Sequence, residues 1–419
     1  MTHRAAFVLL GLLALGSLTQ AQDSPEAKEL AAKATELAKA GKYADALPLV
    51  KKAIQLAPQS DKLLNLASDI EHKLGRFADG LEHAEQAIKI NGKDPGHIYL
   101  AASNAYGLQV VETARKYCGI ILKGGPKDFG AAACQATAAL DDQLHKRTFT
   151  LFWKLDPARG KMVNGAFQIA LPKDGLPYQN CTFEIEGVKS HKVIKGEAND
   201  ILTVVPKGKE PFPVTMKIVT QPYSYKAELA KPGPKTLPAD VKTQLGAIMT
   251  LDPKSPNLKK IIPEVKASDP VTTVKNIQAW MLKNIEYKFE SKTIGDLDFK
   301  VVDDIVKRGH AECRGYALLF TALCRAAEVP ARPVWGILRV PPGSEKKFGD
   351  IVSHSWAEVY LGGVWVPVDP QRPETFGFLP NYYMRTFMDA QKTKTSTEAL
   401  PVLNLMYMHN AKLRFEETR

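Results

Sequence analysis

The sequence predicts a multidomain protein in which an all-α region of helical repeats is followed by an antiparallel β-sandwich-like region and then by a mixed α and β region. Three patterns support this fold class. A period of 34 residues runs through 25–127 of a helical region over 25–145, short β-branched and aromatic runs alternate with turn residues over 147–230, and a buried helix precedes a Gly-Gly hairpin within 240–400. The length of 419 residues fits two or three domains of ordinary size.

The composition is that of a soluble globular protein, with 45% apolar and 24% charged residues. It excludes a disordered chain, a collagen-like chain and a multi-span membrane protein. Five cysteines are too few for a scaffold built on disulfides. The 56 Lys and Arg residues exceed the 45 Asp and Glu residues by 11, but they are scattered along the chain, so we expect no nucleic-acid binding.

The first residues have the pattern of an export signal. Arg4 supplies a positive charge, Ala5–Leu18 is a nearly unbroken apolar run, and Thr19-Gln20-Ala21 places small residues where a signal peptidase cuts. The run is too short to cross the ~30 Å hydrocarbon core of a membrane, and no later apolar stretch is long enough. We therefore expect residues 1–21 to be a signal peptide, and the mature protein to be secreted or periplasmic without a membrane span.

A sequence repeat defines the first region. The run Gly41-Lys42-Tyr43-Ala44-Asp45-Ala46 returns as Gly75-Arg76-Phe77-Ala78-Asp79-Gly80, with each glycine at the turn between two helices. Small and large residues recur in fixed columns: Leu30, Leu64 and Ile98; Ala34, Ser68 and Ala102; Ala46, Gly80 and Ala114; Ala53, Ala87 and Ile121. Over residues 25–127 this pattern resembles the tetratricopeptide repeat.

The third copy departs from the pattern, because Gln109 and Val111 replace the turn glycine and the aromatic residue. A helix over about 129–145 is expected to cap the stack. The resemblance implies a surface for a peptide or protein partner, although a stack of three repeats serves equally as a spacer or dimer surface. Cys118 falls in an interior column and Cys134 on the cap helix, where they form either a disulfide or two separate buried thiols.

Residues 147–230 have the pattern of a small antiparallel β-sandwich-like domain. The first strand begins near Thr148, and the strands are separated by turn signals at Pro157, Gly160, Lys173-Asp174-Gly175, Gly187 and Gly208. No residues in this region have catalytic spacing. The run Lys231-Pro232-Gly233-Pro234-Lys235 is expected to be a linker.

The last region carries a cysteine at a helix start. An amphipathic helix is expected over 271–289, and the run His310-Ala311-Glu312-Cys313-Arg314-Gly315-Tyr316-Ala317 then continues with apolar residues at helical spacing. Cys313 therefore lies in the first turn of a buried helix. The unpaired N–H groups and the dipole at that end are expected to lower its thiol pKa below the free value of about 8.5. Cys324, three turns deeper, is expected to be a packing residue.

A hairpin supplies a base and a carboxylate. Alternating runs, Ser353–Leu361 and Val364–Pro370, flank Gly362-Gly363, which predicts a two-residue turn. If Leu361 pairs with Val364, Trp356 lies opposite Asp369, and His354 is the diagonal neighbour of Asp369 on the same face. Diagonal side chains start ~7–8 Å apart, a gap that an imidazole and a carboxylate can close. The other face carries four valines that suit a core: Val359, Val364, Val366 and Val368.

A thiol at a helix tip, with a histidine and an orienting carboxylate, follows the Cys–His–Asp logic of nucleophilic catalysis. Together with Val329-Pro330-Ala331-Arg332, these motifs resemble the transglutaminase-like superfamily over about residues 265–385. The resemblance implies a papain-like α+β core with Cys313 as nucleophile, His354 as general base and acid, and Asp369 as its orienter. It also implies that the Cys313 backbone N–H contributes to an oxyanion hole.

Two tryptophans and two departures complete the predicted site. Trp356 and Trp365 either wall a substrate cleft or pack within the hairpin. Ala311 stands where the family usually has glycine, and Glu328-Val329 replaces the usual glycine before the Pro-Ala-Arg run, but neither change removes a catalytic group. The chain has no CxxC pair and no HExxH motif, so we expect neither a metal nor a cofactor.

The predicted function is that of an exported thiol enzyme that acts on peptide or carboxamide bonds through a cysteine thioester. The expected substrate is a protein or peptide, for example one of the cell envelope. The resemblance favours hydrolysis, by a peptidase or amidase, over protein cross-linking by an acyltransferase, because exported members of this type lack the calcium-regulated architecture of the animal cross-linkers. The alternative from another class is a non-catalytic envelope binding or scaffold protein that acts through its repeats.

Overall fold

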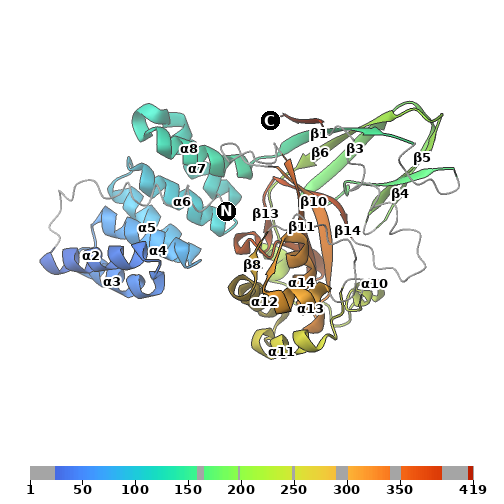
Figure 1. Ribbon diagram of the computed structural model, residues 1–419. Coiled ribbons are helices and arrows are strands. Elements are labelled where there is room, and N and C mark those ends of the chain that lie inside the picture. Colours follow the sequence, from blue (N-terminus) through green and yellow to red (C-terminus); the bar gives the residue numbers. More distant parts are fainter. Residues whose placement is uncertain are drawn as a thin grey trace. The chain divides into compact units, whose positions relative to one another are not determined.

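The computed structural model describes residues 24–157, 165–196, 199–247, 251–288, 301–339, 351–388 and 414–418. They form two compact units: a helical unit that ends at His145, and a larger α and β unit that begins at Lys146 (Figure 1). No helix among the described residues is long and apolar enough to cross a membrane. The predicted signal peptide, residues 1–21, lies outside the described part of the chain.

From Ser24 onward, where the structure describes the chain, three helix pairs and a final helix build the helical unit. The second helix of each pair begins at Tyr43, Phe77 or Val111, so the period of the sequence is also the period of the structure. Residues of the predicted columns, such as Ala34 and Ser68, are fully buried. The helices are α2 (Pro25–Lys39), α3 (Tyr43–Leu56), α4 (Asp61–Lys73), α5 (Phe77–Ile90), α6 (Pro95–Gly107), α7 (Val111–Phe129) and α8 (Ala131–Asp141).

The turns within the pairs share one backbone conformation. Gly41 and Gly75 have φ values of 75° and 72°, and Gln109 has a φ of 63°. The third pair therefore keeps the left-handed turn although its residue is not glycine. The predicted cap helix is α8, which packs against α7. Cys118 and Cys134 on these two helices are free thiols, which agrees with the interpretation of separate thiols.

The β-rich region is a sandwich of two antiparallel sheets, as predicted. One sheet has the order β15-β1-β6-β3 and the other the order β2-β5-β4. The inner faces share one apolar core, to which Phe149 and Met216 contribute from the first sheet and Leu202 from the second. The strands are β1 (Arg147–Leu155), β2 (Phe167–Leu171), β3 (Gln179–Ile185), β4 (Val188–Lys195), β5 (Asp200–Pro206), β6 (Phe212–Thr220) and β15 (Arg414–Thr418). The pairing of β15 with β1 brings a distant segment into this sheet, which the sequence pattern did not predict.

The remaining residues form an α+β core in which helices pack on a four-stranded sheet of order β12-β11-β10-β14. Helix α14 is buried along most of its length against β10 and β11. Two short helices, α9 (Lys226–Leu229) and α10 (Ala239–Thr243), precede the longer helices α11 (Pro256–Val265), α12 (Pro270–Asn284), α13 (Val301–Arg308) and α14 (Cys313–Ala326). The strands are β10 (Ala331–Arg339), β11 (Ile351–Leu361), β12 (Val364–Val368) and β14 (Tyr383–Met388).

The helix predicted over 271–289 ends earlier, at Asn284. The next residues form β8 (Glu286–Tyr287), which pairs in parallel with β9 (His310–Ala311). The backbone N–H of Glu286 donates to the carbonyl of Gly309, and that of Lys288 to the carbonyl of Ala311. Pairing with the segment that precedes Cys313 therefore replaces the last helical turn, which local periodicity could not reveal.

The β-rich region and the α+β core, predicted as separate domains, lie in one compact unit. The side-chain amide of Gln179, in β3, accepts from the backbone N–H of Arg385 at 2.7 Å and donates to its carbonyl at 2.8 Å. Nearby, the buried Glu358 lies between Arg332, at 2.8 Å, and Arg385, at 3.4 Å. A buried polar network thus joins the two regions at strand β14.

Candidate active site

Cys313 is the first residue of α14, and Glu312 caps that helix. One oxygen of Glu312, Oε2, accepts the backbone N–H of Arg314 at 2.8 Å, and the other, Oε1, accepts that of Gly315 at 3.1 Å. The carboxylate thereby satisfies donors that have no partner within the helix. Helix α14 begins at this position because the acidic side chain immediately before it can fold back onto the first turn.

The thiol of Cys313 has two hydrogen-bond partners. It donates to Glu312 Oε2 at 3.3 Å, and it accepts from the backbone N–H of Ser355 in β11. Burial, followed by the Glu312 carboxylate, raises the thiol pKa to about 12. Our expectation of a lowered pKa is therefore wrong: Glu312 occupies the N–H groups of the helix end and places a negative charge beside the sulfur. Cys324 is fully buried in the core, as predicted.

The hairpin has the predicted register. Leu361 pairs with Val364 and Ala357 with Val368. Gly362 and Gly363 both have positive φ values, 59° and 87°, as a two-residue turn of this type requires. Asp369 follows the last residue of β12 directly, so it lies beside His354 as the register implied.

His354 and Asp369 form a buried pair in which Nε2 and Oδ2 are 2.7 Å apart. The same Oδ2 accepts the hydroxyl of Tyr383, in β14, at 2.7 Å, and Oδ1 accepts the backbone N–H of Gln371 at 3.0 Å. Burial opposes ionisation of Asp369, but His354, the Arg372 charge and the Tyr383 hydroxyl hold its pKa below the usual value. The side chain of Gln278, in α12, fixes the backbone by donating to the Asp369 carbonyl at 2.8 Å.

The two tryptophans pack within the fold. Trp356 is fully buried and stacks on His354 with ring centres 6.2 Å apart, while Tyr383 meets it edge-on. Trp365 is covered by the Arg332 guanidinium, 3.9 Å from the ring centre. The structure favours the packing interpretation for both rings, and Trp356 supports the position of the His354 imidazole from behind.

Sequence reasoning missed Glu312, Tyr287 and Tyr383. Tyr287 is 47% exposed, and β8 places it beside the residues that lead to the nucleophile. Partial burial raises its pKa to about 12, and Cys313, Glu312 and Asp369 add to the rise, so its hydroxyl lies near all three groups. An acidic residue directly before a helix is a capping signal that could have identified Glu312. No local pattern marks the tyrosines.

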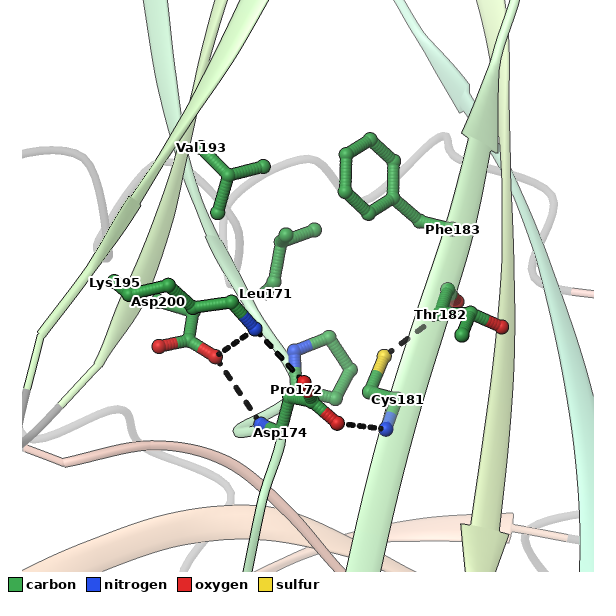
Figure 2. Close-up of a pocket in the computed structure, with 9 residues that line it drawn as sticks. All are labelled: Leu171, Pro172, Asp174, Cys181, Thr182, Phe183, Val193, Lys195 and Asp200. Carbon is green, nitrogen blue, oxygen red and sulfur yellow. Dashed lines mark hydrogen bonds and ion pairs between the residues drawn. The ribbon is translucent and has the colours of Figure 1, made fainter.

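A pocket of about 280 Å³ lies between the two sheets of the β-rich region, where Leu171, Phe183 and Val193 form an apolar wall (Figure 2). Its charged groups are paired with one another: Lys195 is 2.8 Å from Asp174 and 3.2 Å from Asp200. No residue of the Cys313 site lines it. Among the described residues, no group of three or more His, Cys, Asp and Glu side chains is arranged to hold a metal ion.

Comparisons with known proteins agree with the family resemblance predicted for the last region. Residues 259–370 match the family model of the transglutaminase-like superfamily. The chain is 29% identical over 147 residues to the kyphoscoliosis peptidase of Mus musculus, a match that covers 32% of this chain and only 21% of the mouse protein. It is also 34% identical over 121 residues to an uncharacterized protein of Haemophilus influenzae, covering 25% of this chain and 32% of that protein.

Among solved structures, a protein from Cytophaga hutchinsonii described as a "Putative Cysteine Protease" is 16% identical, with a TM-score of 0.41, over 65% of this chain and 87% of that chain. The first TPR of Spaghetti (RPAP3), bound to an HSP90 peptide, is 23% identical, with a TM-score of 0.26, over 28% of this chain and 92% of that one. After its helical repeats and β-rich region in the sequence, the chain carries at residues 259–370 a domain of the transglutaminase-like superfamily.

Proposed function

We propose that this protein is a thiol enzyme that cleaves peptide or carboxamide bonds through a thioester on Cys313. The observation that carries the proposal is the buried His354–Asp369 pair, held on a hairpin whose next residue, Ser355, contacts the thiol of Cys313. A nucleophile, and a base paired with an orienting group on the strand that contacts the nucleophile, are the parts that nucleophilic acyl transfer needs.

The hydrogen bond to Asp369 assigns the two nitrogens of His354. Because an ionised carboxylate only accepts, Nε2 carries a proton and Nδ1 is the basic nitrogen. As Sγ attacks the substrate carbonyl, the thiol proton passes to Nδ1. As the first residue of α14, Cys313 has a backbone N–H with no acceptor within the helix. That N–H belongs to the same residue as the attacking sulfur and can donate to the developing oxyanion.

The intermediate collapses when the C–N bond breaks and the leaving amine takes the proton from Nδ1. Water then attacks the thioester and gives one proton to Nδ1. The acid leaves as the C–S bond breaks, and that proton returns to the sulfur. A primary amine in place of water would give cross-linking instead. We favour hydrolysis, and the name of the mouse relative, a peptidase, agrees with it.

The test is acylation of Cys313 by p-nitrophenyl acetate, followed by mass spectrometry of the labelled peptide. We expect acyl-Cys313 in the parent chain, none in Cys313→Ala, and at least tenfold slower formation in His354→Ala, in line with the usual contribution of a general base. Absence of acyl-Cys313 in the parent would refute the enzyme and favour the non-catalytic alternative. Glutamine peptides with and without a primary amine then separate the two reactions, since amine incorporation faster than acid formation would refute hydrolysis.

Two further predictions concern the rest of the chain. We propose that the helical unit binds a peptide or protein partner, in keeping with solved repeats that it resembles, one of which is bound to a peptide. We also propose that the protein is exported, on the pattern of residues 1–21. N-terminal sequencing of the protein from its native cells tests the second proposal, which an intact Met1 in the mature protein would refute.

A further inference from the structure

The carboxylate of Glu312 is shared between the backbone of α14 and the nucleophile. Its Oε2 atom accepts both the backbone N–H of Arg314, at 2.8 Å, and the thiol of Cys313, at 3.3 Å. Its Oε1 atom accepts the backbone N–H of Gly315 at 3.1 Å. Because the helix fixes two of these donors, the backbone N–H groups, the carboxylate is held in a constant position beside the sulfur.

The fixed carboxylate of Glu312 removes the stabilisation that the N-terminus of α14 would otherwise give to a thiolate. A free helix N-terminus stabilises an anion with its N–H groups and partial positive charge. Here Glu312 takes two of those N–H groups, and its own charge is a like charge for a thiolate at Cys313. The protonated thiol, by contrast, gains a charge-assisted hydrogen bond. The local geometry therefore favours the thiol over the thiolate.

The other ionisable groups around Cys313 come from three further segments. Strand β11 provides His354, and Asp369, after β12, raises the thiol pKa in the same direction as Glu312. Strand β8 provides the Tyr287 hydroxyl, and Arg372 follows Asp369, whose charge it partly offsets. The backbone N–H of Ser355 is the contact that favours the thiolate. Among all these groups, Glu312 is the ionised side chain that makes a hydrogen bond to the sulfur.

We propose that Glu312 is a positioning residue that holds Cys313 as a hydrogen-bonded thiol in the resting site, so that the proton leaves for His354 only as the sulfur attacks. The assignment of His354 as acceptor rests on the proposed function. In this step the S–H bond breaks and its proton moves to Nδ1, while the S–C bond forms and the carbonyl π bond breaks, placing its electron pair on the oxygen. Glu312 stays ionised throughout and remains the cap of α14, and no further reactant is needed.

The experiment measures how fast iodoacetamide alkylates Cys313 at a series of pH values, in the full chain, with the labelled peptide identified by mass spectrometry. Two variants remove the charge: Glu312→Gln, and Glu312→Ser, which keeps a good helix cap. The matched control is Glu328→Gln, which removes an exposed carboxylate, hydrogen-bonded to Lys266, just beyond the other end of the same helix. Thermal melting of each variant confirms that it is folded.

Removal of a like charge in contact with a thiol is expected to lower its pKa by about one unit or more. In both neutral variants the midpoint of the alkylation profile should fall by that amount, with roughly tenfold faster alkylation near neutral pH. Glu328→Gln should leave the profile in place. An unchanged midpoint in both Glu312 variants, or slower alkylation in both, would overturn the assignment.

The outcome separates this inference from the proposed function. If p-nitrophenyl acetate does not acylate Cys313 in the parent chain but both Glu312 variants still shift the alkylation profile, then Glu312 controls the thiol and the enzyme proposal fails. If the parent is acylated and His354→Ala slows the reaction, but neither variant shifts the profile, then the enzyme proposal stands and Glu312 is only a helix cap.

Discussion

Replacing Asp369 by asparagine tests most directly whether this carboxylate orients the His354 imidazole. The side chain has two distinct ends: Oδ1 faces the backbone N–H of Gln371, at 3.0 Å, and Oδ2 faces both His354 and Tyr383, each at 2.7 Å. An asparagine must choose which end carries its NH₂ group. The backbone N–H of Gln371 can only donate, so the amide oxygen is expected to turn towards it.

That choice places the NH₂ group against His354. The ring nitrogen Nε2 must then accept, and the proton moves to Nδ1, the atom that should receive the thiol proton. The Tyr383 hydroxyl can rotate and accept from the same NH₂ group, so this arrangement pairs the amide and the Gln371 N–H and leaves only the Tyr383 hydrogen to find a new acceptor. The opposite orientation would face the Gln371 N–H with an NH₂ group, at a cost of about 1–3 kcal/mol. The unproductive tautomer is therefore the stable one.

The expected loss combines two effects. The wrong tautomer costs about 1–3 kcal/mol, and loss of a charge-assisted hydrogen bond to the imidazolium costs a further ~1.5–3 kcal/mol. Because these effects act on one group, we take a total of roughly 3–4 kcal/mol, or 10²–10³ in acylation rate. The equivalent change in a serine protease costs ~10⁴, and a thiol is intrinsically the better nucleophile, so a smaller factor is reasonable.

The assay is single-turnover acylation of Cys313 by p-nitrophenyl acetate in purified variants with matching circular dichroism and melting. Asp304→Asn, which changes an exposed carboxylate on α13, is the matched control and should alter the rate by less than about threefold. Acylation of Asp369→Asn at the parental rate would show that the carboxylate does not set the His354 tautomer, and the reasoning above would fail.

Two further predictions test the support around the site. Tyr383→Phe removes one donor from Asp369 without changing shape, so acylation should slow about tenfold while melting stays near the parental value; an unchanged rate would show that the hydroxyl is not needed. Gly363→Ala forces a side chain into φ 87° in open space and should cost ~1–2 kcal/mol by urea unfolding. Gly362→Ala should cost clearly more, because its Cβ would lie 1.9 Å from the Glu228 carbonyl oxygen; equal costs would contradict that contact.

The features that the sequence predicted well are those fixed over short distances. The repeat needed only a period, and its second helices begin at Tyr43, Phe77 and Val111 as the period requires. The hairpin needed only Gly362-Gly363 between two alternating runs, because the turn sets the pairing and the pairing sets which side chains share a face. The proximity of His354 and Asp369 followed from that register alone.

The thiol environment could not be predicted from the same reasoning. The pattern showed that Cys313 begins a helix, and a bare helix end lowers a thiol pKa. The structure adds two facts that reverse the sign: Cys313 is partly buried, and Glu312 uses the helix donors for its own carboxylate. Position at a helix start thus predicted only the contribution that lowers the thiol pKa. Burial and the Glu312 side chain, which depend on the fold, raise that pKa and outweigh it.

Strand β14 shows why the support of the His354–Asp369 pair could not be predicted from the sequence. This strand carries Tyr383, whose hydroxyl donates to Asp369. Two residues later it carries Arg385, whose backbone N–H and carbonyl both form hydrogen bonds with the Gln179 side chain. Gln179 belongs to the β-rich region and is separated from Arg385 by 206 positions in the chain. No local period connects such residues, because their contact exists only once both regions have folded. The β-rich region is therefore part of the framework that positions Asp369, through the strand that it shares with the core.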